Sequence, residues 1–228
     1  TSTALMIKVL SRLGAKAAPF LPHRIDDGYG LAEGTLQRCI EEFHPGLVVT
    51  VDCGTGAADS VKMAARAGVD VIVTDHHESS GVVAPAFAMV NPKLGTDEAS
   101  KVLAGVGVAF KLCHALLKRG RQNGQKRAEE IDLRLYLDLV GVGTIADVVP
   151  LKDENRILAR YGLDQLNKTK SAGLKALADV AGIQGRIDAY HVGFLIGPRL
   201  NAAGRLGDAQ AALDLLMTDD PLRARDLA

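Results

Sequence analysis

Two runs of β-branched residues, each followed by acidic or imidazole side chains, limit what this chain can fold into more than any other feature. Residues 47–51 (LVVTV) run into Asp52, and residues 69–74 (VDVIVT) run into the triplet Asp75-His76-His77. Short apolar runs of this composition predict buried β-strands. In an open α/β sheet, ligands bind beyond the carboxyl ends of the strands. Both runs therefore put groups that can bind metal or transfer protons where a ligand site is expected.

The segments around these runs have helical patterns, and this sets the fold class. We expect helices over residues 2–13, 31–43 and 57–67, and strands over residues 17–21, 47–52, 69–74 and 86–90. Alternating strands and helices with short loops predict an α/β fold, in which a parallel β-sheet is flanked by helices. Right-handed crossovers then bring all strand carboxyl ends to one edge.

After Pro92 the predicted structure becomes mostly helical. A charged connector is expected over residues 119–130, and helices over residues 102–118, 133–146, 154–166, 173–181 and 209–217. We therefore divide the chain into an α/β core over residues 1–151 and a helical extension over residues 152–228. The chain begins at Thr1 directly in helical pattern, which suggests a piece of a longer protein.

Composition narrows the class of protein. Of the 228 residues 47% are hydrophobic, enough for a substantial core, but no apolar stretch approaches the length of about 20 residues that a membrane span needs. The three cysteines, Cys39, Cys53 and Cys113, show no paired spacing, which favours a reducing cytoplasm. Lys plus Arg equals Asp plus Glu, 27 each. Zero net charge does not favour a nucleic-acid partner, yet an acidic metal site can mask a basic groove in the sum.

Three positions are candidates for metal chemistry. Asp52 and the triplet 75–77 follow predicted strands, and Asp147 lies in an otherwise apolar, glycine-punctuated stretch where a carboxylate is costly unless it is paired or bound to metal. Adjacent side chains at a strand end point in different directions, so one histidine can bind metal while the other faces substrate. The ordinary alternatives are a helix-capping acid at 52, exposed loop histidines at 76 and 77, and a helix-end acid at 147.

Phosphate contacts are the second kind of candidate. Arg199, Asn201 and Arg205 lie among small residues in the segment GPRLNAAGR, and Arg24 lies in the segment PHRIDDGYG. Arginine suits bidentate contacts to phosphate. The alternative is that these are solvated charges on a helix and a loop.

Together these segments resemble the RecJ family of the DHH phosphoesterase superfamily, whose members are single-strand-specific 5′→3′ DNA exonucleases. The segments PHRIDDGYGL, VTVDCGTG, VIVTDHH, NPK, LAGVGVAFKL, GVGTIADVVPL and GPRLNAAGRL occur in family order through most of the chain. The DHH string alone indicates only the superfamily, whereas GTIADVVPL and PRLNAAGR are much more specific to RecJ-like members.

The resemblance implies two-metal phosphodiester hydrolysis in DNA repair and recombination. It implies that Asp52 bridges two divalent cations, foremost Mn²⁺ and alternatively Mg²⁺, and that His76 and Asp147 are further metal ligands. Asp75 would orient its neighbours, and His77 would face the scissile phosphate. Contacts to single-stranded DNA with a 5′ end would come from Arg24, Arg199, Asn201 and Arg205. Single-strand-binding protein and recombination helicases are the implied protein partners.

One departure from the family pattern limits what we expect of this chain alone. The first family motif, an Asp-rich string that supplies ligands to both metals, should immediately precede Thr1, and the C-terminal DHH-associated and oligonucleotide-binding domains are missing too. We therefore expect little or no nuclease activity from the chain by itself. The alternatives are an oligoribonuclease or small-nucleotide phosphodiesterase of the same superfamily, a non-catalytic RecJ-like scaffold, and a nucleotide-binding module, for which residues 54–56 are too short a glycine loop.

Overall fold

A three-stranded parallel sheet organises the first half of the protein. The computed structural model describes residues 1–22, 30–79, 81–205 and 209–228. Its strands are β1 (Leu47–Val51), β2 (Asp70–Thr74) and β3 (Ala88–Val90), in the order β1-β2-β3. Leu47 pairs with Asp70, and Ile72 pairs with Ala88, so all three strands end at the same edge. The predicted parallel sheet is confirmed.

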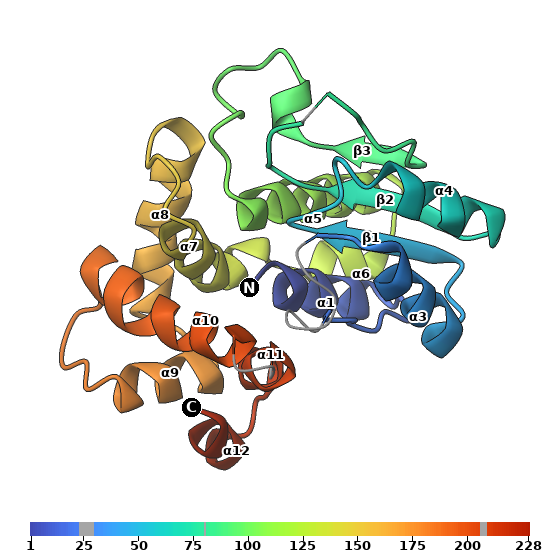
Figure 1. Ribbon diagram of the computed structural model, residues 1–228. Helices are drawn as coiled ribbons and strands as arrows, with labels where there is room; N and C mark the ends of the chain where they lie inside the picture. Colours follow the sequence, from blue (N-terminus) through green and yellow to red (C-terminus); the bar gives the residue numbers. More distant parts are fainter. Residues whose placement is uncertain (23–29, 80, 206–208) are drawn as a thin grey trace.

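Helices cover both faces of this sheet (Figure 1). The helices α3 (Glu33–Phe43) and α4 (Ala58–Arg66) pack on one face, where Val71 and Val73 join their buried side chains. The helices α1 (Ser2–Leu13) and α5 (Gly105–Gln122) lie on the other face, with Val49 and Val51 packed against their cluster. Residues two apart on one strand share a face, which explains this division. The predicted fold class is confirmed.

The prediction of a strand over residues 17–21 is wrong. These residues form no regular structure and do not pair with the described sheet. Pro19 and Pro22 explain the difference, because a proline has no backbone N–H to donate to a ladder. The segment packs through its side chains instead, with the Phe20 ring edge-on to Phe43 at 6.2 Å between centroids.

The charged connector predicted over residues 119–130 is largely helical. Helix α5 continues to Gln122, and α6 (Lys126–Glu130) follows after a short turn. Gly120 does not end α5, because the buried Ala128 methyl packs against it; a Cβ on Gly120 would lie 2.7 Å from the Ala128 Cβ. Gly120 is therefore a close-packing position within a helix.

The second half is helical, as predicted. The short helix η1 (Pro92–Leu94) lies between β3 and α5. After α6 come η2 (Leu133–Tyr136), α7 (Leu137–Ala146), α8 (Asp153–Leu166), α9 (Ala172–Val180), the π-helical η3 (His191–Ile196), α10 (Gly197–Arg205), α11 (Ala209–Met217) and α12 (Pro221–Leu227). Among the helices of the described residues, none combines the length and apolar composition needed to cross a membrane.

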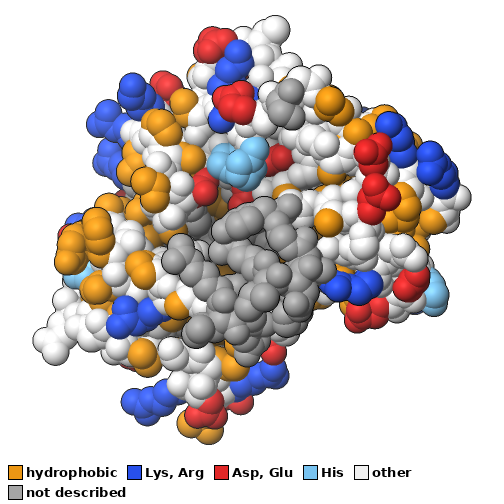
Figure 2. All heavy atoms as spheres, in the orientation of Figure 1, with side chains coloured by type: hydrophobic (Ala, Val, Ile, Leu, Met, Phe, Trp, Pro, Cys, Tyr) orange, Lys and Arg blue, Asp and Glu red, His pale blue; other side chains and the backbone are white. Residues whose placement is uncertain are grey.

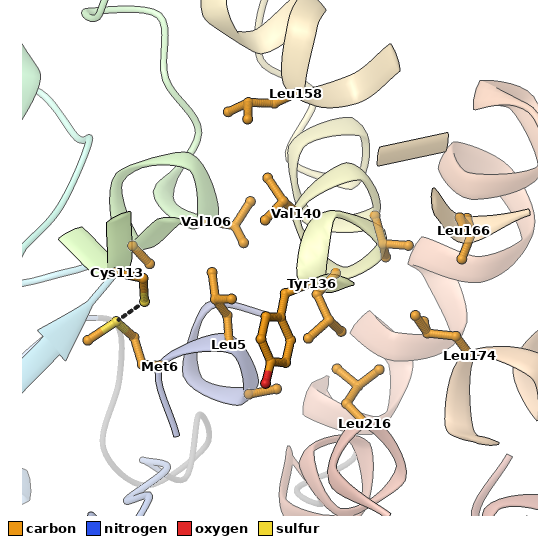
Figure 3. Close-up of a cluster of buried hydrophobic side chains, with 14 of the residues drawn as sticks. Leu5, Met6, Val106, Cys113, Tyr136, Val140, Leu158, Leu166, Leu174 and Leu216 are labelled. Atoms are coloured by element: carbon orange, nitrogen blue, oxygen red, sulfur yellow. Dashed lines mark hydrogen bonds between the residues drawn. The ribbon is translucent and has the colours of Figure 1, made fainter. Parts of the chain in front are cut away.

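One hydrophobic cluster joins the two halves (Figure 3). Leu5 and Val106 from the sheet-covering helices lie in the same cluster as Val140, Leu174 and Leu216 from the later helices. Helices α7 and α8 approach closely at two glycines, where a Cβ on Gly141 would lie 2.7 Å from the Cα of Gly162. The division into domains at residues 151 and 152 stays a prediction.

Candidate metal centre

The ends of β1 and β2 bring Asp52 next to the triplet. The Asp52 backbone N–H donates to the carbonyl of Thr74 at 2.9 Å, which continues the parallel ladder to the last residue of β2. Asp52 itself has φ 67°, a left-handed conformation that aspartate adopts more readily than most residues. Gly105, at the start of α5, makes room for its carboxylate, because any Cβ at that position would overlap the Asp52 side chain.

His76 lies at the centre of the cluster. Its Nδ1 is 3.1 Å from the carbonyl oxygen of Leu103, and its Nε2 is 3.0 Å from Asp52 Oδ1 and 3.5 Å from Asp147 Oδ2. A carbonyl can only accept, so Nδ1 carries the proton that it donates. In the neutral ring the Nε2 lone pair therefore faces two carboxylates.

This arrangement fits a cation. Nε2 of His76 is buried and, despite its short approach to Asp52, no oriented hydrogen bond satisfies it within the described residues. The Asp52 carboxylate raises the pKa of His76 above its ordinary value, against the opposing effect of burial. Burial raises the pKa of Asp147, and the nearby Asp52 charge adds to that shift. Three acceptor atoms that repel one another are stabilised by a divalent cation between them, and imidazole with carboxylate ligands suits Mn²⁺.

His77 is within reach of the same point. One ligand atom each of Asp52, His76 and His77 can be chosen so that all three lie within 4.8 Å of one another. The two imidazole rings are tilted by 60° with centroids 4.5 Å apart. Figure 2 shows histidine side chains flanked by acidic ones beside a hollow in this face of the molecule. The exposed edge of the cluster thus opens to solvent on the side of His77, whose side chain is 63% exposed.

Asp147 reaches the cluster from the end of helix α7. Its N–H donates to the carbonyl of Gly143, and the next residue, Val148, has φ 59° and is exposed. A left-handed conformation is unusual for a β-branched residue. The N-terminus of α5 lies beside both acids, and the charge of His76 and the Gly105 N–H both lower the pKa of Asp147 against the larger effect of burial. The positive end of a helix dipole stabilises such carboxylates.

Asp75 does not face this point but lies buried behind the two histidines. Its Oδ2 accepts from Thr55 N and Thr55 Oγ1, at 2.9 and 2.7 Å. Its Oδ1 accepts from the N–H groups of His76 and His77 and from His77 Nδ1. Burial alone raises the pKa of Asp75, but these hydrogen bonds together lower it below the ordinary value.

The predicted phosphate contacts are only partly gathered here. Asn201 lines a cavity of about 470 Å³ that Asp52 and Asp147 also line. Arg199 is exposed, and its Nη1 donates to the carbonyl of Leu195 on the preceding turn. Arg24 lies outside the described residues, as does the side chain of Arg205.

With this geometry established, the protein's family follows from its similarity to known proteins. The model of the DHH family, N-terminal domain, matches residues 1–144. The chain belongs to the DHH family. The RecJ resemblance is also confirmed: the single-stranded-DNA-specific exonuclease RecJ of Bacillus subtilis (strain 168) is 44% identical over 230 residues, covering 100% of this chain and 28% of that protein.

Solved structures agree with this membership. A crystal structure of exonuclease RecJ bound to manganese matches with a TM-score of 0.87 and 40% identity, over 99% of this chain and 55% of that one. RecJ of Thermus thermophilus in complex with Mn²⁺ matches with a TM-score of 0.82 and 38% identity, over 99% and 31%. The chain spans between 28% and 41% of the length of the curated RecJ relatives it matches.

Two polar residues of this DHH-family site, Thr55 and Asn91, escaped sequence reasoning. Thr55 is 2% exposed and Asn91 is 7% exposed, and both are hydrogen-bonded into the Asp75 network. Both follow strand ends, Thr55 after β1 and Asn91 directly after β3, so the rule that flagged Asp52 and Asp75 also applies to them. The Leu103 carbonyl that orients His76 is a backbone group, and nothing in the sequence marks it.

Proposed function

We propose that this chain is part of a 5′→3′ single-stranded-DNA exonuclease that acts in DNA repair and recombination by metal-dependent hydrolysis of phosphodiester bonds. The observation that carries the proposal is the convergence of Asp52 Oδ1 and Asp147 Oδ2 on the buried, unsatisfied Nε2 of His76. The similarity to RecJ over the full length of this chain supports the choice of substrate and direction.

Each residue then has a role in the proposal. Asp52 would be a ligand of both cations, because its carboxylate is more exposed than that of Asp147 and can offer both oxygens. His76 and Asp147 complete the described ligand set. The site would hold two divalent cations, with Mn²⁺ preferred for this mixed nitrogen and oxygen set and Mg²⁺ as the alternative. When bound, they would supply a hydroxide nucleophile at neutral pH and neutralise charge on the phosphate.

The remaining residues act on the substrate. Asp75 orients the histidines, and His77, at the exposed edge, faces the scissile phosphate as a charge stabiliser or proton donor. Arg24, Arg199, Asn201 and Arg205 contact the DNA backbone, and Asn201 has the best-supported position because it lines the same cavity as the acids. Single-stranded DNA with a 5′ end is the substrate, and single-strand-binding protein and recombination helicases are the proposed partners in the cytoplasm.

Metal binding to this chain is the first test. We expect this chain to bind Mn²⁺ and His76→Ala to abolish the binding. A titration with Mn²⁺ measures this by calorimetry and by the electron paramagnetic resonance signal of free Mn²⁺. His77→Ala should retain most of the binding. His114→Ala is the matched control, since His114 is exposed on α5 and lies outside the cluster. Equal loss of binding in the control and in His76→Ala would remove His76 from the ligand set.

Nuclease activity is the second test, and it needs a longer protein that contains this chain. We expect Mn²⁺-dependent release of nucleotides from the 5′ end of single strands, lost in Asp52→Ala and Asp147→Ala. The 228-residue chain alone should show little activity, because its described acceptors are too few to complete the coordination of two cations. Cleavage of dinucleotides but not of long strands would replace the proposal with a small-nucleotide phosphodiesterase. Absence of any cleavage would favour a non-catalytic scaffold.

A further inference from the structure

We propose that Thr55 and Asn91 are positioning residues that hold His77 in a single orientation and a single tautomer, with the proton on Nδ1 and the lone pair on Nε2. The four residues Asn91, Thr55, Asp75 and His77 form a closed ring of hydrogen bonds. The catalytic consequence of this ring rests on the proposed function, whereas the ring and the tautomer can be tested without it.

The direction of the ring begins at Asn91. Its Oδ1 accepts from the Lys93 backbone N–H at 2.9 Å, which determines which end of the amide is oxygen. Nδ2 therefore points the other way, and its two protons go to Thr55 Oγ1 at 2.8 Å and to the His77 carbonyl at 2.9 Å. One side chain thus holds both the backbone of His77 and the hydroxyl that comes next in the ring.

The Thr55 hydroxyl accepts from Asn91 and therefore donates to Asp75. Because Oγ1 accepts from Asn91, its single proton is free to go to Asp75 Oδ2, 2.7 Å away. The Thr55 backbone N–H donates to the same oxygen at 2.9 Å. Asp75 Oδ2 is therefore fixed as an acceptor from two directions, which sets the rotation of the carboxylate.

The carboxylate then determines the tautomer of His77. Asp75 Oδ1 accepts from the backbone N–H groups of His76 and His77, at 2.8 and 3.2 Å, and Oδ2 accepts twice from Thr55. Donors on both oxygens favour the ionised carboxylate, so Oδ1 has no proton to give. His77 Nδ1 lies 2.7 Å from this oxygen and must donate to it. A neutral imidazole has one N–H, so Nε2 carries the lone pair on the substrate side, and it can donate to a phosphate there only after it takes up a proton.

The ring joins the ends of all three strands. Thr55 follows β1, Asp75 and His77 follow β2, and Asn91 follows β3. Thr55, Asp75 and Asn91 are buried, whereas His77 is exposed. Buried polar networks are held firmly when every member is satisfied, because an unpaired member is costly in a low dielectric. The exposed imidazole of His77 is thereby held by three buried residues.

The test compares isosteric substitutions in this metal-free chain. Thr55→Val removes the hydroxyl and keeps the shape, Thr55→Ser restores the hydroxyl, and Asn91→Ala removes both amide donors. The ring nitrogens of His77 are followed by long-range ¹H–¹⁵N nuclear magnetic resonance at a pH above the range in which imidazoles titrate, with His77→Gln to assign its signals. We expect the wild type and Thr55→Ser to show the Nδ1–H tautomer alone, and Thr55→Val and Asn91→Ala to show a mixture of both tautomers.

Thr169→Val is the matched control. Thr169 Oγ1 donates to the buried Asp138 Oδ2 at 2.6 Å, so the same bond is lost in the helical half of the protein. It should leave the His77 signals unchanged. If Thr55→Val and Asn91→Ala both keep the wild-type tautomer while remaining folded, or if Thr169→Val changes it, the positioning role is wrong.

The consequence for catalysis is measured in the longer protein. Substitution of residues that orient an active-site histidine costs about 10-fold to 100-fold, so we expect Thr55→Val to lower kcat about 10-fold with KM for DNA changed by less than about twofold. Thr55→Ser should recover most of kcat. A kcat loss that Thr55→Ser does not recover overturns the catalytic part. A longer protein without nuclease activity overturns the proposed function, and the tautomer result still decides the positioning claim.

Discussion

Two buried aspartates, one at the edge of the sheet and one in the helical region, each accept a hydrogen bond from a threonine hydroxyl, yet their pKa values are shifted in opposite directions. Asp75 Oδ2 accepts from Thr55 Oγ1 at 2.7 Å, and Asp138 Oδ2 accepts from Thr169 Oγ1 at 2.6 Å. Both residues are almost fully buried, at 2% and 5% exposed. Yet the pKa of Asp75 is lowered, and burial raises the pKa of Asp138.

The difference lies in the number of donors. Asp138 has the Thr169 hydroxyl and the N–H of Leu139, with Lys8 more distant, and these do not offset its burial. Asp75 has five donors on its two oxygens, three of them backbone N–H groups of the strand-end turns. The turns at the strand ends therefore bring more free backbone N–H groups to Asp75 than the first turn of α7 brings to Asp138, and these groups keep a buried carboxylate ionised.

The largest expected effect is the loss of stability in Asp75→Asn. Both oxygens of Asp75 accept from donors, but the asparagine amide has only one acceptor oxygen. Its NH₂ group must therefore face the donors that one of the two carboxylate oxygens satisfies in the wild type. Leaving buried donors unsatisfied costs about 1–3 kcal/mol each, and we expect the free energy of unfolding in urea to fall by about 3 kcal/mol. Asp59→Asn, at an exposed acid on α4, should change it by less than about 0.5 kcal/mol. A loss of stability no larger than that of Asp138→Asn would contradict the claim that the number of donors distinguishes the two aspartates.

A smaller effect is expected for Asp138→Asn. The amide oxygen can accept from the Leu139 N–H, and its NH₂ group can donate to the Thr169 hydroxyl, so each partner stays satisfied. We expect a change of about 1 kcal/mol or less in the free energy of unfolding. A loss as large as that of Asp75→Asn would mean that the ionised form of Asp138 is needed for folding.

The smallest effect is a difference in pH dependence. The pKa of Asp138 is raised above its ordinary value of 3.8, so the folded state binds more protons than the unfolded state between 3.8 and the raised pKa. Stability contributed by this group is therefore lost as the pH rises through that window. The opposite holds for Asp75, whose contribution is present above 3.8 and is lost as the pH falls through its lowered pKa.

Urea unfolding of the wild type and Asp138→Asn at several pH values checks this prediction. We expect the stability of the wild type to fall relative to Asp138→Asn as the pH rises from 3.8 upward. The reverse slope, with the wild type gaining stability over the variant, would show that Asp138 is held as Asp75 is. The two aspartates would then differ in their place in the fold but not in the direction of their pKa shifts.

Local pattern was enough for much of the fold. The strands at 47–51 and 70–74 and the helices around them follow from residue type and periodicity, which act within a few residues. Local pattern failed at residues 17–21, where Pro19 and the following Pro22 outweigh an apolar run. It also failed at Gly120, where a methyl group from another helix requires a glycine within α5. The prolines can be read from the sequence itself, whereas the contact of Gly120 with Ala128 is visible only when the packing partner is known.

The sequence by itself determined that acids and histidines follow the parallel strands and that these residues carry the motifs of the DHH family. Only the tertiary structure decided which of them meet. Asp147 approaches His76 from a separate helix, the Leu103 carbonyl sets the His76 tautomer, and Thr55 with Asn91 closes the ring around Asp75. The reason is physical: strand and helix preference are local, whereas the protonation and orientation of a buried side chain depend on every donor that packing brings to it.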